Sequence, residues 1–307
     1  ALLQQLAVNN VDRPIGTIVY TQLCNESGGI EADVTITRLA DDRFYFVTGS
    51  ALGVRDRSTI ERHAPDDGSV DIVEQTSAKA VLNLCGPRAR DVLATLTDAP
   101  LDNASFPYMS ARTLDVAQAR VLALRVTYVG EIGYELHVPT EYALQLYERL
   151  WAAGEPYGIA NAGYRVINSL RLEKHYLVWG SDVSSDYNPY EAGLGFCVAM
   201  GKGEFLARAA LADIRARGPT RRLAWFTAAP ELDLFGGEIV LRGDQVAGRV
   251  TSAGYGYTVG RNIFCAYVAA DAPLEGDYRI EVMGETHAAK RHTRPLYDPD
   301  RRAIMAV

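Results

Sequence analysis

Hydrophobic and polar positions in the first half of the chain alternate with a period of two in several short stretches. In residues 30–39, three apolar side chains alternate with the polar residues Asp33, Thr35 and Thr37. This alternation predicts a half-buried β-strand with the three polar side chains on its wetter face. Further strands are expected at 18–23, 44–49, 80–86, 111–116, 120–129 and 134–138.

Other stretches have the spacing of amphipathic helices. Helices are expected near 51–63, 87–96, 141–154 and 161–175. Thr140 is the expected N-cap of the third helix, since threonine at that position accepts a hydrogen bond from a free backbone N–H. The sequence GEIG at 130–133 is expected to be a tight link between two strands.

The pattern of expected elements changes near 215–222. This charged segment contains a Gly-Pro pair that ends the preceding helix. Few helical patterns follow it. Short strands are expected at 222–228, 237–243, 245–252, 263–269 and 278–284. We therefore expect an α+β fold with two domains, 1–214 and 215–307, of which the second is a small all-β barrel or sandwich.

The composition indicates which classes of protein and of binding partner are compatible with this chain. Of 307 residues, 48% are hydrophobic and 22% charged, enough apolar material for a packed core. The net charge of −7 argues against nucleic acid as the main partner. No apolar run approaches the roughly 20 residues that span a bilayer. The four cysteines lie far apart in the sequence, which favours reduced thiols and a cytoplasmic location.

Several common kinds of site are missing from the sequence. Residues 254–260 hold a Gly-x-Gly but lack the third glycine of a dinucleotide fingerprint, and no phosphate-binding GxxxxGK motif occurs. We therefore expect this chain to bind no flavin itself. The five histidines lack the spacing of a metal site, and no metal is predicted. No nucleophile elbow is present, so carboxylate chemistry remains.

Asp33 is the first carboxylate of interest, because it lies in an otherwise apolar strand just after a Gly-Gly turn. It is either a solvated residue on a strand face or an acid held at the wall of a cleft, where partial burial tunes its proton affinity. The strand alone leaves both interpretations open.

Two further segments carry polar candidates. Tyr128 and Glu135 flank the turn in YVGEIGYE, and a carboxylate there suits the paired N–H donors of a guanidine-like heterocycle. The alternative is an ordinary hairpin with an exposed glutamate. In residues 168–182, the simplest interpretation is an amphipathic helix with Arg171, Glu173 and Lys174 as solvated charges.

Taken together, the motifs resemble one known family. They follow one another in the family's order: YTQLCNESGGIEADVTITRL (20–39), LNLCGPRARDVL (82–93), YVGEIGYELHV (128–138), SLRLEKHYLVWGSD (169–182), NPYEAGLGFCV (188–198) and VTSAGYGYTVGRN (250–262). The chain is similar to the tetrahydrofolate-dependent aminomethyltransferases, whose founding member is the glycine cleavage T-protein. The most similar branch is the folate-binding half of dimethylglycine and sarcosine dehydrogenases and oxidases, and the tail RPLYDPDRRAI (294–304) suits that branch.

The resemblance implies site residues one by one. The family's essential aspartate matches Asp33, and its pterin-binding glutamate matches Glu135. Other positions that would line the folate site are Tyr20, Thr35, Tyr128 and Tyr176. Where many T-proteins have an arginine, this chain has Ile167. Family members also begin several tens of residues earlier, so the N-terminal part of the first domain is expected to be missing.

The function expected from the resemblance is transfer of a one-carbon unit from an N-methyl or aminomethyl amine to tetrahydrofolate, giving 5,10-methylenetetrahydrofolate. The implied partners are a small amine donor, folate and a flavin-containing domain or subunit, with no nucleic acid and no membrane. Two alternatives stay open. One is a stand-alone demethylase that yields 5-methyltetrahydrofolate, and the other is a non-catalytic folate-binding module.

Overall fold

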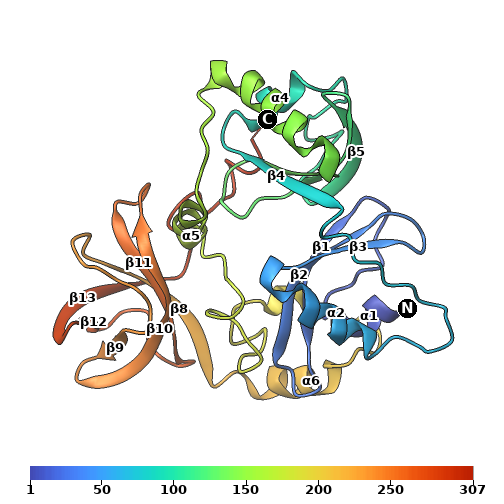
Figure 1. The fold of residues 1–307 in the computed structure, drawn as a ribbon. Helices are drawn as coiled ribbons and strands as arrows, with labels where there is room; N and C mark the ends of the chain where they lie inside the picture. The colour runs from blue at the N-terminus through green and yellow to red at the C-terminus, as the bar shows by residue number, and fades with distance from the viewer. Residues whose placement is uncertain (307) are drawn as a thin grey trace.

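The computed structural model describes residues 1–306, which form three lobes (Figure 1). The first lobe contains a three-stranded antiparallel sheet in the order β1-β2-β3. Its strands are β1 (Ile18–Cys24), β2 (Ile30–Arg38) and β3 (Phe44–Val47). The helices of this lobe are α1 (Leu2–Leu6), α2 (Gly53–Glu61) and α6 (Arg208–Arg217). One face of the sheet packs on an apolar core that includes Val34 and Ile36.

The second lobe is a four-stranded antiparallel sheet in the order β4-β7-β6-β5 with helices against it (Figure 1). Its elements are β4 (Lys79–Cys85), α3 (Ala89–Ala94), β5 (Ser110–Val116), β6 (Ala119–Arg125), β7 (Gly133–Pro139) and α4 (Ala143–Gly154). The helix α4 buries Leu146 and Leu150 against the core under the sheet. After α4 the chain continues to α5 (Tyr164–Glu173), which packs on the third lobe.

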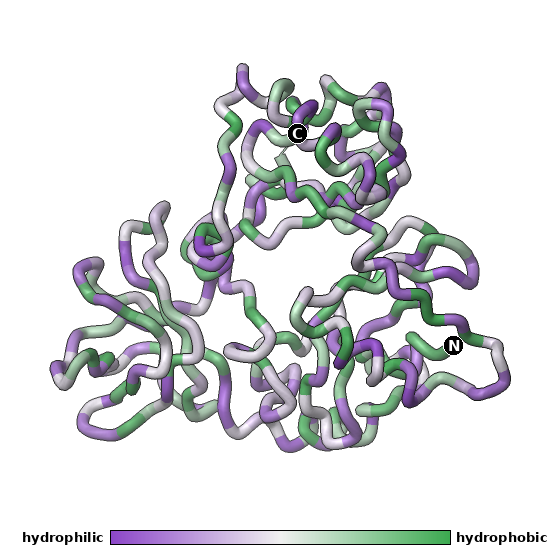
Figure 2. Tube along the Cα trace, in the orientation of Figure 1, coloured by the Kyte–Doolittle hydropathy of each residue, from purple (hydrophilic) through white to green (hydrophobic). Residues whose placement is uncertain are grey.

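The third lobe is a closed antiparallel barrel in the order β10-β11-β8-β13-β12-β9. Its strands are β8 (Arg221–Ala228), β9 (Ile239–Arg242), β10 (Gln245–Gly256), β11 (Arg261–Ala269), β12 (Tyr278–Val282) and β13 (Glu285–His292). Figure 2 shows that its outer turns are predominantly hydrophilic. The expected α+β fold with a C-terminal barrel is thus confirmed. The division at 214/215 stays a prediction; α6 runs on to Arg217 and β8 begins at Arg221.

Four local expectations were wrong. The barrel has a sixth strand, β13, where no strand was expected; four of its eight residues are exposed and none is fully buried. Thr140 does not cap a helix; its hydroxyl donates to the Ser77 carbonyl oxygen, and α4 begins only at Ala143. The strand β6 ends at Arg125, so the link to β7 is longer than GEIG. Thr37 is fully buried, although it was expected on the wetter face of its strand.

Candidate functional site

The polar face of the β1–β2 pair is the centre of the candidate site. Antiparallel register places Gln22 directly opposite Asp33 and Tyr20 directly opposite Thr35. Side chains at positions two apart point to the same face of a strand, so these four share one face. The other face carries the apolar residues of the first lobe's core. The alternation in β2 therefore puts apolar side chains on the face that packs on the core, and Asp33 and Thr35 on the opposite face.

The Gly-Gly turn before β2 fixes where this face begins. A Cβ atom on Gly29 would lie 2.1 Å from the Ser185 carbonyl oxygen, so no larger residue fits there. Gly28 has φ +89, a conformation that side chains other than glycine rarely adopt. The Asn25 side-chain oxygen accepts the Gly29 N–H at 2.9 Å, and the Ile30 N–H donates to the Tyr187 carbonyl oxygen. The turn thus anchors β2 against residues 185–187.

Asp33 is held by a hydrogen bond from its opposite residue, since the Gln22 Nε2 atom donates to its Oδ1 atom at 2.8 Å. Burial raises the pKa of Asp33 to about 6, and hydrogen bonds from Gln22 and Tyr20 limit the rise. A carboxyl group with such a pKa exchanges a proton near neutral pH, which an ordinary surface aspartate does not. The cleft interpretation of Asp33 is therefore favoured over a solvated strand residue.

Two tyrosines lie near this carboxyl group, and a third stacks on one of them. Burial raises the pKa of Tyr20 well above its usual range, and the Asp33 charge adds to the rise. The same charge contributes to the raised pKa of Tyr128, where burial is again the main cause. The ring of Tyr128 stacks on that of Tyr176, with centroids 6.0 Å apart and planes 17° apart. These contacts bring Asp33, Tyr20, Tyr128 and Tyr176 into one neighbourhood.

Glu135 comes from the other sheet. It lies on β7, and its Oε2 atom is 3.3 Å from the His137 Nε2 atom. The Nδ1 atom of the same imidazole lies 3.1 Å from the Tyr45 hydroxyl on β3. The Glu135 side chain keeps 28% of its surface exposed. It therefore lies where the first two lobes meet, with part of its surface open to a ligand, and its role in pterin binding stays a prediction.

A buried ion pair between Arg171 and Asp182 contacts the backbone of Tyr176. The Arg171 guanidinium donates to Asp182 at 2.5 Å and to the Tyr176 carbonyl oxygen at 2.9 Å. It also donates to the Ser252 hydroxyl of the barrel at 2.7 Å. The expectation that Arg171, Glu173 and Lys174 are solvated was wrong, since all three are buried with at most 3% exposed. They face the barrel and the C-terminal segment, which the helical pattern alone does not reveal.

Gln22 is the residue that the sequence motifs did not single out. It lies inside the YTQLC segment, two positions after Tyr20, so strand alternation alone puts it on the same face. Its side chain is fully buried. The missing information was the cross-strand register that pairs it with Asp33, and one sequence does not contain that register.

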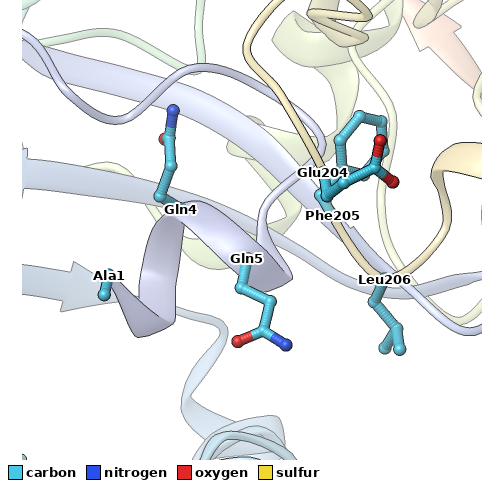
Figure 3. Close-up of a pocket in the computed structure, with 6 residues that line it drawn as sticks. All are labelled: Ala1, Gln4, Gln5, Glu204, Phe205 and Leu206. Atoms are coloured by element: carbon cyan, nitrogen blue, oxygen red, sulfur yellow. The ribbon is translucent and has the colours of Figure 1, made fainter.

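Two surface hollows lie away from these residues. The first is formed by α1 and the segment before α6, as Figure 3 shows. Its lining residues are Ala1, Gln4, Gln5, Glu204, Phe205 and Leu206. The second lies between residues 23–27 and the end of α2. Neither is lined by any of the six predicted site residues, so neither alters the assignment of the candidate site.

Within residues 1–306, no group of three or more His, Cys, Asp or Glu side chains is arranged to hold a metal ion. No helix in the same range combines the length and apolar character needed to cross a membrane.

Comparison with known proteins agrees with this architecture. The profile of the GCVT N-terminal domain matches residues 1–202, and that of the glycine cleavage T-protein C-terminal barrel domain matches residues 221–298. The crystal structure of glycine cleavage system aminomethyltransferase T from Bartonella henselae superposes with a TM-score of 0.84 and 26% identity, covering 97% of this chain and 81% of that chain.

Curated relatives fall into two kinds. Mouse mitochondrial sarcosine dehydrogenase is 36% identical over 97% of this chain, but this chain spans only 35% of its length. The aminomethyltransferase of Symbiobacterium thermophilum is 30% identical over 98% of this chain and 82% of the relative. The profile matches, the fold and these relatives agree, and the chain belongs to the glycine cleavage T-protein family of aminomethyltransferase-type proteins.

Proposed function

We propose that this chain transfers a one-carbon unit to tetrahydrofolate and yields 5,10-methylenetetrahydrofolate. The observation that carries the proposal is Asp33, a carboxyl group with a pKa near 6 close to Tyr20 and Tyr128, in a chain of this family. In the same proposal the chain is the folate half of a dimethylglycine or sarcosine dehydrogenase-type system. The long relatives, of which it spans about a third, support this finer part.

The residues present fit a reduced pterin. Tyr128 and Tyr176 offer aromatic faces for a flat ring, and Glu135 offers two acceptor oxygens to neighbouring N–H groups. Gln22 has a buried oxygen that accepts no hydrogen bond from residues 1–306. Tyr20 and Thr35 extend the polar face next to Asp33. In the proposal, these side chains bind and orient the folate.

Bound tetrahydrofolate would supply the two nitrogens that take up the methylene carbon. As two N–C bonds form to a carbon at the formaldehyde level of oxidation, each folate nitrogen gives up its proton and the donor's amine or water leaves. Asp33 is suited to accept one such proton and to stabilise positive charge on nitrogen, because it is ionised at neutral pH with a pKa near 6.

The proposed partners are a small N-methyl or aminomethyl amine and a flavin-containing domain or subunit that would oxidise it. The proposal includes no flavin site within this chain and a cytoplasmic location. Mass spectrometry of the folate products tests the reaction. With an amine donor at the iminium or formaldehyde level, we expect 5,10-methylenetetrahydrofolate as the product.

Two results would contradict the proposed transfer to 5,10-methylenetetrahydrofolate. Formation of 5-methyltetrahydrofolate without an oxidant would indicate a stand-alone demethylase. Tight binding of tetrahydrofolate in calorimetry, with no product from any donor tried, would indicate a non-catalytic folate-binding module. Absence of binding would refute both the proposed reaction and this alternative.

A further inference from the structure

Gln22 has an environment that packing does not explain. Its side chain is fully buried in β1, and its Nε2 atom donates to Asp33 Oδ1 at 2.8 Å from the directly opposite position on β2. At the other end of the amide, the Oε1 atom is buried and accepts no hydrogen bond from residues 1–306. An unpaired buried acceptor destabilises a fold, and an apolar side chain of similar size would avoid that cost.

The hydrogen bond has a definite chemical effect on its acceptor. A carboxylate only accepts hydrogen bonds, whereas a protonated carboxyl group must place a hydrogen on one of its oxygens. A fixed N–H donor therefore favours the charged form and restrains the direction of the side chain. The amide is suited to this task because it carries no charge of its own and does not titrate.

We propose that Gln22 is a positioning residue for the one-carbon transfer: it holds Asp33 in its charged form and leaves the remaining carboxylate lone pairs to take a proton from the reacting nitrogen. This inference rests on the proposed function, since it assigns Asp33 the role of proton acceptor. Gln22 acts through Asp33, and no direct contact with the reacting atoms is required of it.

The titratable groups near Asp33 do not titrate in the same pH range as Asp33. Tyr20 and Cys24 lie near it on β1, Cys197 on the 3₁₀ turn Gly195–Cys197, and Tyr128 on the loop between β6 and β7. Burial raises the pKa of each of these four groups, that of Cys197 to about 12. All four stay neutral between pH 5 and 9. A carboxyl titration near pH 6 in this cluster therefore belongs to Asp33.

The test is Gln22→Met, which keeps the approximate size of the side chain and removes the donor. Infrared difference titration of the intact chain follows the Asp33 carboxyl band, which is assigned by its loss in Asp33→Asn. We expect the Asp33 midpoint to rise by about one to two pH units, as for loss of a hydrogen bond to a charged group. The acid limb of the kcat/KM profile should move by the same amount.

Activity and stability should separate in this variant. At pH 7 the fraction of ionised Asp33 falls about two- to tenfold for such a shift, and the rate should fall with it. Raising the pH to 9 should restore most of the rate, whereas KM for tetrahydrofolate should change less than about threefold. The Tm should fall at pH 8 and recover towards the wild-type value at pH 5, because the higher Asp33 pKa costs stability only where that carboxyl group is ionised.

Thr37→Val is the matched control. Thr37 is also fully buried, four positions after Asp33 in β2, and its hydroxyl oxygen has no hydrogen-bond partner within residues 1–306. Its removal should keep the Tm at or above the wild-type value and leave the Asp33 midpoint and the pH profile unchanged. Should Gln22→Met fail to fold, Gln22→Leu also lacks the donor and should show the same upward shift.

An unchanged Asp33 midpoint in either Gln22 variant would overturn the inference. So would a loss of rate that persists at pH 9 together with an equal loss of Tm at pH 5 and pH 8, which would mark Gln22 as merely structural. The infrared titration needs no substrate, so it tests Gln22 independently of turnover. Failure of the wild type to bind tetrahydrofolate would instead refute the proposed function.

Discussion

Replacing Asp33 with asparagine changes a carboxylate into an amide of the same size and leaves its main partner in place. Gln22 can still donate to the remaining side-chain oxygen of residue 33, so the β1–β2 pair should keep its geometry. The amide cannot take up a proton or balance positive charge on nitrogen. We expect kcat to fall on the order of 10²-fold or more, with little change in the dissociation constant of tetrahydrofolate.

The same substitution should stabilise the fold, by an amount that depends on pH. Burial raises the pKa of Asp33 from 3.8 to about 6, so the native state binds a proton more tightly than the unfolded state. Stability from this group is fully present below pH 4 and is lost as the pH rises through 6. The shift of about two units corresponds to about 3 kcal/mol at pH 8 and about half of that at pH 5.

Urea denaturation at pH 8 and pH 5 measures this difference. Asp33→Asn should raise the free energy of unfolding by up to about 3 kcal/mol at pH 8, and by about half as much at pH 5. The exposed Asp115, with 74% of its side chain accessible, provides the control, and Asp115→Asn should change little at either pH. Wild-type turnover by Asp33→Asn, with the fold intact by circular dichroism, would refute the proton-acceptor role. Equal stability changes at both pH values would refute the burial argument.

Three further predictions concern other parts of the molecule. Glu135→Gln should weaken tetrahydrofolate binding by about 1.5–3 kcal/mol, the value of a charge-assisted pair; calorimetry measures it, and an unchanged dissociation constant would remove Glu135 from the site. Arg171→Met leaves Asp182 buried without its partner and should lower the free energy of unfolding by about 3–5 kcal/mol in urea, whereas the exposed-pair control Arg217→Met should lower it by less than about 1 kcal/mol. The purified chain should be colourless, and a stoichiometric flavin spectrum after desalting would contradict the predicted absence of a flavin site.

Local patterns predicted the sheet that carries the site but not what its residues touch. Alternation in β2 placed Asp33 on the polar face, and the Gly-Gly turn placed it at the start of a strand. The partner Gln22 stayed unnoticed, because cross-strand register joins residues that are eleven positions apart. Periodicity reports which residues share a face of an element, and it says nothing about what lies opposite that face.

The charged residues of α5 illustrate the same limit on a larger scale. A charge on a helix is usually solvated, and nothing within residues 164–173 indicates otherwise. Burial of Arg171 depends on Ser252, which is 81 positions later in the chain, and on Asp182. The strand β13 was missed for a related reason, since its polar side chains pack into a barrel only because β8 and β12 flank it.

The ion pair of Arg171 and Asp182 also bears on how the molecule comes apart. Asp182 accepts a hydrogen bond from Thr251 of the barrel at 2.8 Å, and its carbonyl oxygen accepts one from Tyr267. Detaching the barrel would strip these partners from two charges that have at most 2% of their surface exposed. Such a species carries a large desolvation penalty with reduced compensation, so it should hardly accumulate during unfolding. We therefore expect residues 1–202 and 221–298, which match two separate domain families, to unfold in one cooperative transition.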